Sequence, residues 1–425
     1  MAREKKTSTS APEMKKERKV LEFNTVEQEE ETPKKRRPFG LIVFLLVVIL
    51  IAVGAGVYMN RTTYYNDYEV LSSAESSNTT QMDYLAYNGS LIKYSKEGIS
   101  YLDKEGNSVW MESYNMKQPK AVVSGEYIAV ADLNGNNVYI FNASGKVSME
   151  ETPYKICTVD VARQGVFAVI LENETEDFIE IYDKNGGTIA EMRTTIADSG
   201  YPLDIALSED GQKLMTSYIT IQGIKAQNTI AAYNFGDVGQ NETDRLVGGF
   251  NNLDSTIVPK LEFLNNDTVC AFGDNRFIVY SMKEKPSEKA VIKDFQGEIQ
   301  SIFYNSRYIG VVEENTGTAE EGQETADASR YRLRVFDTNG NQKFAKELNF
   351  SYKNIYATEN EIIIVGDSES RIYDFTGKLK FSYEFAKNVN NIVPTGVNNK
   401  YIIVYDNSTE IVKLRYTKEE EQETK

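Results

Sequence analysis

The sequence contains no histidine, and this absence limits the chemistry that the protein can perform. Without histidine there is no Ser/His or Cys/His nucleophile system, and the common zinc ligand sets and the usual pH-sensitive side chain are missing. No Gly-rich phosphate loop or nucleophile elbow is present either. We therefore expect a protein that is not an enzyme, with no catalytic, cofactor-binding or metal-binding residue.

Cysteine is also scarce. Cys157 and Cys270 are the only two cysteines, and each lies within an apolar, strand-like run. Because free cysteine is among the most buried residue types, both are predicted to be small buried side chains. A single disulfide between them stays open as an alternative, although extracellular chains that depend on disulfides usually contain more cysteines.

Basic charge is scarce in most of the chain. Residues 1–38 contain 11 Lys and Arg against 8 Asp and Glu, which leaves 36 basic and 55 acidic residues for the remainder. Nucleic acid is excluded as a partner, because phosphate binding needs basic patches. The acidic surplus is interpreted as keeping a large exposed domain soluble.

Residues 39–59 form a long uncharged run and are predicted to be a transmembrane helix. In a helix these 21 residues would span roughly 30 Å, the thickness of the hydrocarbon core of a bilayer. Residues 34–37, just before the run, are all basic, which places the N-terminus in the cytoplasm and the rest of the chain outside. A cleaved signal peptide is less favoured, because the run is too long and a 38-residue tail precedes it.

Composition sets the other boundaries. Residues 1–38 alternate basic and acidic blocks with few apolar side chains, which predicts a disordered cytoplasmic tail. Residues 60–81 are expected to be a linker, residues 82–416 an extracytoplasmic domain, and residues 417–425 a charged, disordered tail.

A short pattern repeats through residues 82–416. Alternating apolar residues lead to an aromatic residue or Leu, then to Asp or Asn, two further residues and Gly, as in ISYLDKEG and IEIYDKNG. Further strand-like runs flank each copy, and four antiparallel strands in a unit of about 40 residues are typical of a propeller blade. The sequence therefore predicts an all-β, eight-bladed β-propeller preceded by one transmembrane helix. The eight units have their marker residue at positions 103, 142, 183, 234, 281, 337, 374 and 415.

The marker residues are interpreted as structural. In a tight hairpin an Asp or Asn accepts hydrogen bonds from backbone N–H groups, and the Gly adopts the positive φ that the turn requires. The stretches DLNGNN (132–137) and DTNGN (337–341) lack the spacing and terminal Glu of a calcium-binding EF-hand, so they too are predicted to be hairpin turns.

Three segments depart from the regular repeat. Residues 221–228 lengthen a hairpin in the fourth unit, and residues 313–330 are predicted to be a disordered insertion in the sixth. The eighth unit ends at Tyr416 one strand short. Residues 64–71 are predicted to supply that strand and close the ring; the alternative is that residues 60–80 are only a linker.

Two stretches resemble known propellers. ISYLDKEGNSVWMES (99–113) resembles the repeat of quinoprotein-type eight-bladed propellers, and GYPLDIALSEDGQKLMTSY (200–218) resembles the strand–turn–strand unit of WD40-like propellers. From residue 39 onward, the chain resembles an uncharacterised family of single-pass, membrane-anchored β-propellers of Gram-positive anaerobes. That resemblance implies an architecture and no activity.

The chain also departs from the quinoprotein pattern. Cofactor-binding quinoproteins have regular tryptophan docking repeats, and many have an adjacent cysteine pair, whereas here Trp110 is the only tryptophan. A quinone cofactor is therefore rejected. Non-catalytic members, such as the outer-membrane assembly scaffold lipoprotein, are the closer analogy.

Two functions remain open. The favoured one is a non-enzymatic, membrane-anchored extracytoplasmic module that binds or scaffolds membrane or envelope proteins. The alternative is a carboxylate-dependent hydrolase of cell-envelope glycans, but 55 acidic residues make chance pairs inevitable and none stands out. No binding residue is predicted, and neither is the propeller face that binds.

Overall fold

The computed structural model describes residues 43–51, 64–75, 82–195, 199–315 and 331–418. The chain divides into two units, Met1–Arg61 and Thr62–Lys425. In the first unit, residues 43–51 are helical. The rest of the predicted transmembrane run, the predicted tail at 1–38 and most of the predicted C-terminal tail lie outside the described residues. Among the residues that are described, no helix is long and apolar enough to cross a membrane.

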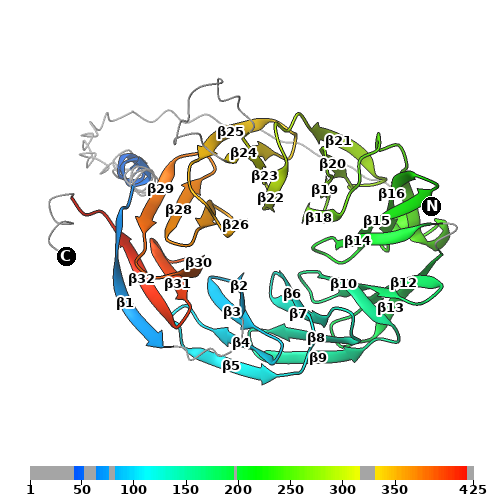
Figure 1. Cartoon of the computed structure of the whole chain (residues 1–425), viewed down its shortest axis with the longest axis horizontal. Coiled ribbons are helices and arrows are strands. Elements are labelled where there is room, and N and C mark those ends of the chain that lie inside the picture. Colours follow the sequence, from blue (N-terminus) through cyan, green and yellow to red (C-terminus); the bar gives the residue numbers. More distant parts are fainter. Residues whose placement is uncertain (1–42, 52–63, 76–81, 196–198, 316–330, 419–425) are drawn as a thin grey trace, which may run out of the picture. The chain divides into compact units, whose positions relative to one another are not determined.

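The second unit is an eight-bladed β-propeller, which confirms the predicted all-β fold (Figure 1). In the described part of the chain its strands form eight sheets of four antiparallel strands. The sheets are arranged around a common axis, and one edge strand of each sheet is innermost (Figure 1).

The strands fall into four sets by their position in the blade. The innermost strands are β2 (Asp83–Tyr87), β6 (Pro119–Ser124), β10 (Lys155–Val161), β14 (Tyr201–Leu207), β18 (Lys260–Asn265), β22 (Ile299–Tyr304), β26 (Asn354–Ala357) and β30 (Val389–Pro394). The second strands are β3 (Ser90–Tyr94), β7 (Tyr127–Asp132), β11 (Phe167–Glu172), β15 (Lys213–Gln222), β19 (Thr268–Phe272), β23 (Tyr308–Glu314), β27 (Glu361–Val365) and β31 (Lys400–Tyr405). The third strands are β4 (Gly98–Leu102), β8 (Asn137–Asn142), β12 (Glu176–Tyr182), β16 (Lys225–Asn234), β20 (Phe277–Ser281), β24 (Tyr331–Asp337), β28 (Glu369–Asp374) and β32 (Ser408–Arg415). The outermost strands are β5 (Ser108–Ser113), β9 (Gly145–Glu151), β13 (Thr188–Thr195), β17 (Leu246–Phe250), β21 (Ser287–Ile292), β25 (Gln342–Leu348), β29 (Leu379–Glu384) and β1 (Asp67–Glu75).

The last blade joins the two ends of the propeller chain. Its sheet has the order β1-β32-β31-β30, so the outermost strand comes from the start of the unit and the other three from its end. β1 runs from Asp67 to Glu75, whereas the sequence predicted 64–71 for this strand. The guanidinium of Arg415 donates to Oδ2 of Asp67 at 2.9 and 2.7 Å, and the Thr417 hydroxyl donates to the same oxygen at 2.9 Å. These bonds fix the seam of the ring.

Two short 3₁₀-helices, η1 (Asp237–Gly239) and η2 (Thr243–Arg245), lie between β16 and β17. The turns at Asp103, Asp183, Asp337 and Asp374, each between a third and an outermost strand, follow the predicted marker chemistry. In the first blade, Oδ1 of Asp103 accepts from the backbone N–H of Glu105 at 3.0 Å and of Asn107 at 2.8 Å, and Gly106 has φ 83°. The same pattern recurs at Asp183. These carboxylates stabilise hairpins.

The core lies between the blades. On β11, Val169 and Leu171 pack toward the preceding blade, and Ala168 and Ile170 pack toward the following one. Because both faces of a strand are buried in this way, the second strand of each blade reads as a continuous apolar run.

The cysteine prediction was half wrong. Cys270 is buried in β19, but Cys157 is exposed, and both thiols are free. Cys157 sits where the pairing register of β10 with β11 shifts, between Ile156 and Thr158. A bulged residue leaves the regular alternation, so it need not point into the core.

The predicted insertion in the sixth blade also begins later than expected. Glu313 and Glu314 belong to β23, and Glu313 is fully buried. Its Oε2 accepts the backbone N–H of Gln296 at 2.9 Å. Residues 316–330 lie outside the described part of the chain.

Candidate functional site

Five charged side chains lie on four successive innermost strands. Lys120 is on β6, Asp160 on β10, Asp204 on β14, and Lys260 and Glu262 on β18. Innermost strands surround the propeller axis, so residues far apart in sequence are brought to one side of it (Figure 1). We call these five residues the charged arc.

Each charge in the arc is held by a neighbouring blade. The backbone N–H of Leu207 donates to Oδ2 of Asp160 at 2.7 Å, and that of Leu261 donates to Oδ2 of Asp204 at 2.8 Å. Tyr304, on β22, donates its hydroxyl to Oε2 of Glu262 at 2.7 Å. The arc therefore cross-links the inner strands of blades two to six.

One lysine of the arc is paired and the other is not. The Lys260 ammonium lies 3.1 Å from Oε2 of Glu262 and 3.4 Å from Oδ2 of Asp204. The Lys120 ammonium donates to the Thr158 hydroxyl at 2.9 Å. Among the described residues, no carboxylate lies within ion-pairing distance of Lys120, and no cation within that distance of Asp160. The arc thus presents an ammonium and a carboxyl group that a ligand can pair with.

Burial and neighbouring charge shift the protonation of the arc. Burial, together with the Glu262 carboxylate, raises the pKa of Asp160 to about 7. Burial and the like charge of Lys260 lower the pKa of Lys120. Burial lowers the pKa of Lys260, but the negative charges of Glu262 and Asp204 outweigh this effect. The pKa of Lys260 is therefore held well above the usual range. The charge of the arc therefore changes near neutral pH, at Asp160.

Solvent reaches the arc. The side chains of Lys260 and Glu262 are 36% and 23% exposed, and that of Asp204 is 7% exposed. Lys120 and Asp160 are half-buried. The charged groups of the arc are therefore partly accessible to solvent.

The inner strands of blades six to eight differ from the arc. β22, β26 and β30 contain no charged residue. Apart from the Lys353 ammonium, which donates to the backbone carbonyl of Val389 on β30 at 3.2 Å, the links described for these strands are neutral. Tyr352 donates to the Ser301 hydroxyl at 2.9 Å, Tyr356 donates to the backbone carbonyl of Ile392, and Asn391 donates to that of Tyr84 at 3.4 Å. We call this set the neutral arc.

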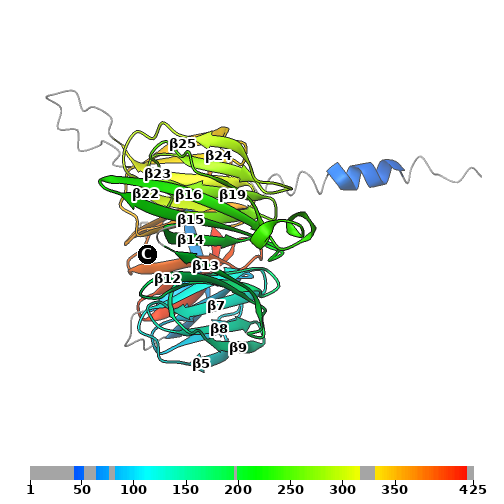
Figure 2. The same ribbon diagram turned by 90° about the vertical axis from the view of Figure 1, so that its right-hand side faces the viewer.

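The fourth blade has a projecting hairpin. β15 and β16 are 10 residues each and stay paired to Gln222 and Lys225, so the hairpin extends beyond its neighbours (Figure 2). Gly223, with φ 63°, is the first residue of a two-residue turn, as a type II′ turn requires. The tip side chains Ile221 and Ile224 are 68% and 101% exposed. We call this hairpin the finger.

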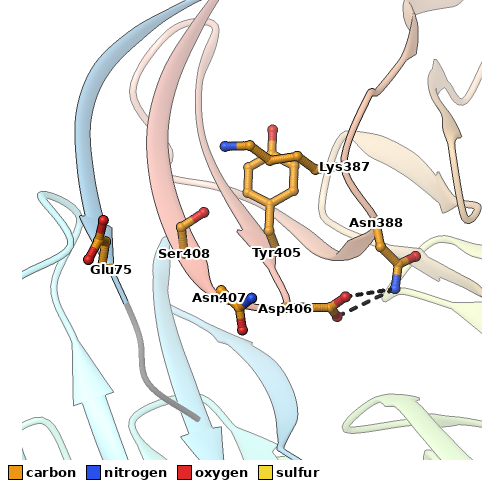
Figure 3. Close-up of a pocket in the computed structure, with 7 residues that line it drawn as sticks. All are labelled: Glu75, Lys387, Asn388, Tyr405, Asp406, Asn407 and Ser408. Atoms are coloured by element: carbon orange, nitrogen blue, oxygen red, sulfur yellow. Dashed lines mark hydrogen bonds between the residues drawn. The ribbon is translucent and has the colours of Figure 1, made fainter.

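A cavity of about 700 Å³ lies at the seam of the ring (Figure 3). Glu75 ends β1, Tyr405 ends β31, Asp406 and Asn407 form the turn between β31 and β32, and Ser408 begins β32. Lys387 and Asn388, from the loop between β29 and β30, complete the lining. We call this cavity the seam pocket.

The motifs that the sequence singled out do not form a site. Oδ1 of Asp132, in the DLNGNN stretch, accepts from the backbone N–H groups of Lys117 and Gln118, both at 2.9 Å. Oδ1 of Asp337, in DTNGN, accepts from the N–H of Asn339 and Asn341. In both stretches the carboxylate accepts hydrogen bonds from backbone N–H groups and so stabilises the local backbone conformation.

Sequence reasoning missed the arc. Asp204 and Glu262 lie in PLDIALS and KLEFLN, two of the strand-like runs that flank the repeat. A charge inside an otherwise apolar strand was the available signal, because charged residues are rarely buried without a partner. Comparing the opening strands of all eight units would have shown that only some of them contain such charges.

A family model matches residues 59–414, most of the chain. The chain belongs to the family of unknown function DUF5711. No protein of curated function matches the sequence. The family assignment therefore fixes no activity, and the geometry of the site has to be interpreted directly.

Solved structures share the fold at low identity. Chaetomium thermophilum Sqt1, solved bound to the N-terminus of ribosomal protein L10, has a TM-score of 0.52 and 10% identity over 82% of this chain and all of that one. BamB from Moraxella catarrhalis has a TM-score of 0.49 and 12% identity, again over 82% of this chain and all of that one. At such identities the likeness shows the fold alone.

Proposed function

We propose that the protein is a membrane-anchored binding module that holds a charged segment of another membrane or envelope protein at the charged arc, without catalysis. The carrying observation is the contrast between the arcs. Most links at the inner strands of blades six to eight are neutral hydrogen bonds, with the Lys353 ammonium as a charged exception, so closure there relies little on ionised groups. The charges of the arc are not required to close the ring, and solvent reaches them. Such charges are suited to recognising a partner.

The finger supports a protein as the partner. Exposed apolar side chains that project from a surface are typical anchors of protein–protein contacts. The finger joins a second to a third strand, so it lies on the propeller face opposite the start of β1 at Asp67.

The proposed anchor is the uncharged run at 39–59. Its length and the basic residues before it are the reasons for proposing that the N-terminus is cytoplasmic and the propeller outside. Protease treatment of intact cells tests this: the propeller should be digested while an epitope fused to the N-terminus is protected. Protection of the propeller would contradict it.

Cross-linking tests binding at the arc. Cys157 is exposed on inner strand β10, whereas Cys270 is fully buried, so a thiol-reactive photo-cross-linker can be placed on Cys157 alone. Burial and Glu172 raise the pKa of Cys157 to about 11, so labelling should be done at alkaline pH. The matched control is Asn354→Cys in a Cys157→Ser background, an exposed position on β26 of the neutral arc.

We expect the cross-linker on Cys157 to give a defined protein adduct in native membranes. The cross-linker at Asn354→Cys should give a lower yield of that adduct. Equal adducts from both positions would contradict recognition by the arc.

One observation favours the alternative, a hydrolase of envelope glycans. Asp160 has its pKa raised to about 7 and lies in the electrostatic field of Glu262, and a protonated carboxyl near an ionised one is the arrangement that glycosidases use. Turnover of purified wall glycans by the full-length protein, abolished in Asp160→Asn, would establish this function in place of the first.

A further inference from the structure

We propose that the ring opens between its eighth and first blades, and that the buried ammonium of Lys93 promotes this opening. Separation of two neighbouring blades would connect the propeller axis with the outer surface of the ring. The contact between the eighth and first blades is called the closing interface (Figure 1). The inference concerns the ring itself and does not depend on the charged arc or on a partner.

The closing interface has the smallest apolar core of the eight interfaces in the described part of the chain. It contains six buried residues, namely Leu91, Leu102, Val393, Ile402, Val404 and Ile411. Each of the other seven interfaces has its own cluster, with between eight and fourteen buried residues. Because burial of apolar surface is the main attraction between packed sheets, the closing interface is expected to be the weakest.

The closing interface also contains a buried charge. Lys93, on β3, is 8% exposed and lies two residues after Leu91, so both side chains face the eighth blade. Its ammonium donates to the Thr409 hydroxyl at 3.0 Å, and among the described residues no carboxylate lies within ion-pairing distance of it. On β7, Ile128 and Val130 occupy the same two places against the first blade, and both are apolar. The blade repeat itself therefore does not require a charge at this place.

The buried ammonium weakens the closing interface. An ammonium has three N–H donors, and one hydroxyl satisfies only one of them. Removing the charge from water is unfavourable when no carboxylate compensates for it, and burial accordingly lowers the pKa of Lys93. Opening of the interface returns the ammonium to water, so the charge favours the open ring.

Two further polar links described for the closing interface are long. Asn391 donates to the backbone carbonyl of Tyr84 at 3.4 Å. The Lys400 ammonium lies 4.0 Å from the carboxylate of Glu105, whose side chain is 65% exposed. Hydrogen bonds weaken at such lengths, and exposed ion pairs contribute little to stability. These links therefore do not compensate for the small apolar core.

Thiol labelling of the full-length protein under native conditions tests the inference. Val404→Cys, in a Cys157→Ser background, places a thiol inside the closing interface, while Cys270 in the same chain reports on the interface between the fifth and sixth blades. Val311→Cys, made in the same background, is the matched control, because Val311 is also buried between the fifth and sixth blades. Labelling by N-ethylmaleimide is followed at each thiol by mass spectrometry and divided by its rate in the urea-unfolded chain.

The thiol at position 404 is expected to react at least about tenfold faster than Cys270 and than the thiol at position 311, because local opening exposes it alone. Equal or slower labelling at position 404 would mean that the blades separate only when the whole ring unfolds. That result would overturn the inference.

Lys93→Met tests the role of the buried charge. Methionine fills a similar volume without charge, so labelling at position 404 is expected to slow by about fivefold or more, while labelling of Cys270 stays the same. Lys96→Met, in the exposed turn that follows β3, is the matched lysine control and should change neither rate. An unchanged or faster rate at position 404 in Lys93→Met would contradict a role for the ammonium in opening.

Discussion

The charged arc and the neutral arc join neighbouring blades at or next to the innermost strands, but with different side chains. In the charged arc, Glu262 accepts from Tyr304 of the next blade at 2.7 Å. In the neutral arc, Ser301 accepts from Tyr352 at 2.9 Å. The comparison shows that a serine hydroxyl joins two blades where a carboxylate does so elsewhere, so this link does not require an ionised group.

Charge at the axis also has a cost. Removing an ion from water is unfavourable, and attraction between partners offsets that penalty only when the geometry is good. Lys260 meets this condition with two carboxylates, but Lys120 and Asp160 do not. Lys120 and Asp160 therefore contribute little to stability through charge pairing. Their presence is better explained by a role in binding a partner.

The largest stability effect is expected when one partner of the paired lysine is lost. Lys260→Met leaves Asp204 and Glu262 without their cation, and we expect a loss of about 2 kcal/mol in the free energy of unfolding. The estimate is below that for a fully buried pair because Lys260 is 36% exposed and solvent screens it. Urea unfolding followed by the fluorescence of Trp110, the single tryptophan, measures it. A change below 0.5 kcal/mol would show that the pair is not structural.

The matching change in the neutral arc should cost less. Ser301→Ala removes the acceptor of the Tyr352 hydroxyl, and we expect a loss of about 1 kcal/mol, the usual net value of one hydrogen bond. The same unfolding assay applies. The cross-link from Cys157 should be unchanged, and its loss would contradict the division of roles between the arcs.

The pH dependence should separate the arcs further. A carboxyl group with a raised pKa binds its proton more tightly in the folded state, so its contribution is complete below its ordinary pKa of 3.8 and is lost as the pH rises toward 7. Asp160→Asn should therefore reduce the fall in unfolding free energy between pH 5 and pH 8 by about 1 kcal/mol. Identical pH profiles for the two chains would show that Asp160 is not the titrating group.

The smallest stability effect is expected at the finger. Ile224→Ser changes a fully exposed side chain, so the unfolding free energy should stay within about 0.5 kcal/mol. The yield of the Cys157 adduct should nevertheless fall, because the apolar tip contacts the partner. An unchanged yield would remove the finger from the binding surface and leave the arc alone.

Much of the fold was predictable because it is periodic in sequence. The marker turns and apolar runs gave eight units, and residues 221–228 were recognised as a lengthened hairpin. The arc was not predictable in the same way, because its five charges come from four strands whose meeting at the axis is a tertiary property. Cys157 was misplaced since a bulge, invisible in the apolar pattern, turns it outward.

The seam shows the same limit. The missing strand of the eighth unit pointed to a contribution from the segment before the first blade, but the bonds from Arg415 and Thr417 to Asp67 depend on the ring being closed. The seam pocket likewise exists only after residues about 330 positions apart have met. Local sequence does not encode such a cavity.

One measurement tests the central claim most directly. In the fivefold variant Lys120→Gln, Asp160→Asn, Asp204→Asn, Lys260→Gln and Glu262→Gln, all five charges of the arc are removed and hydrogen-bonding groups are kept. We predict that its unfolding free energy stays within about 1 kcal/mol of the unmodified chain, because neutral links suffice elsewhere in the ring, while the Cys157 adduct is lost. A variant that keeps the adduct but loses several kcal/mol would show that the charges serve the fold and not a partner.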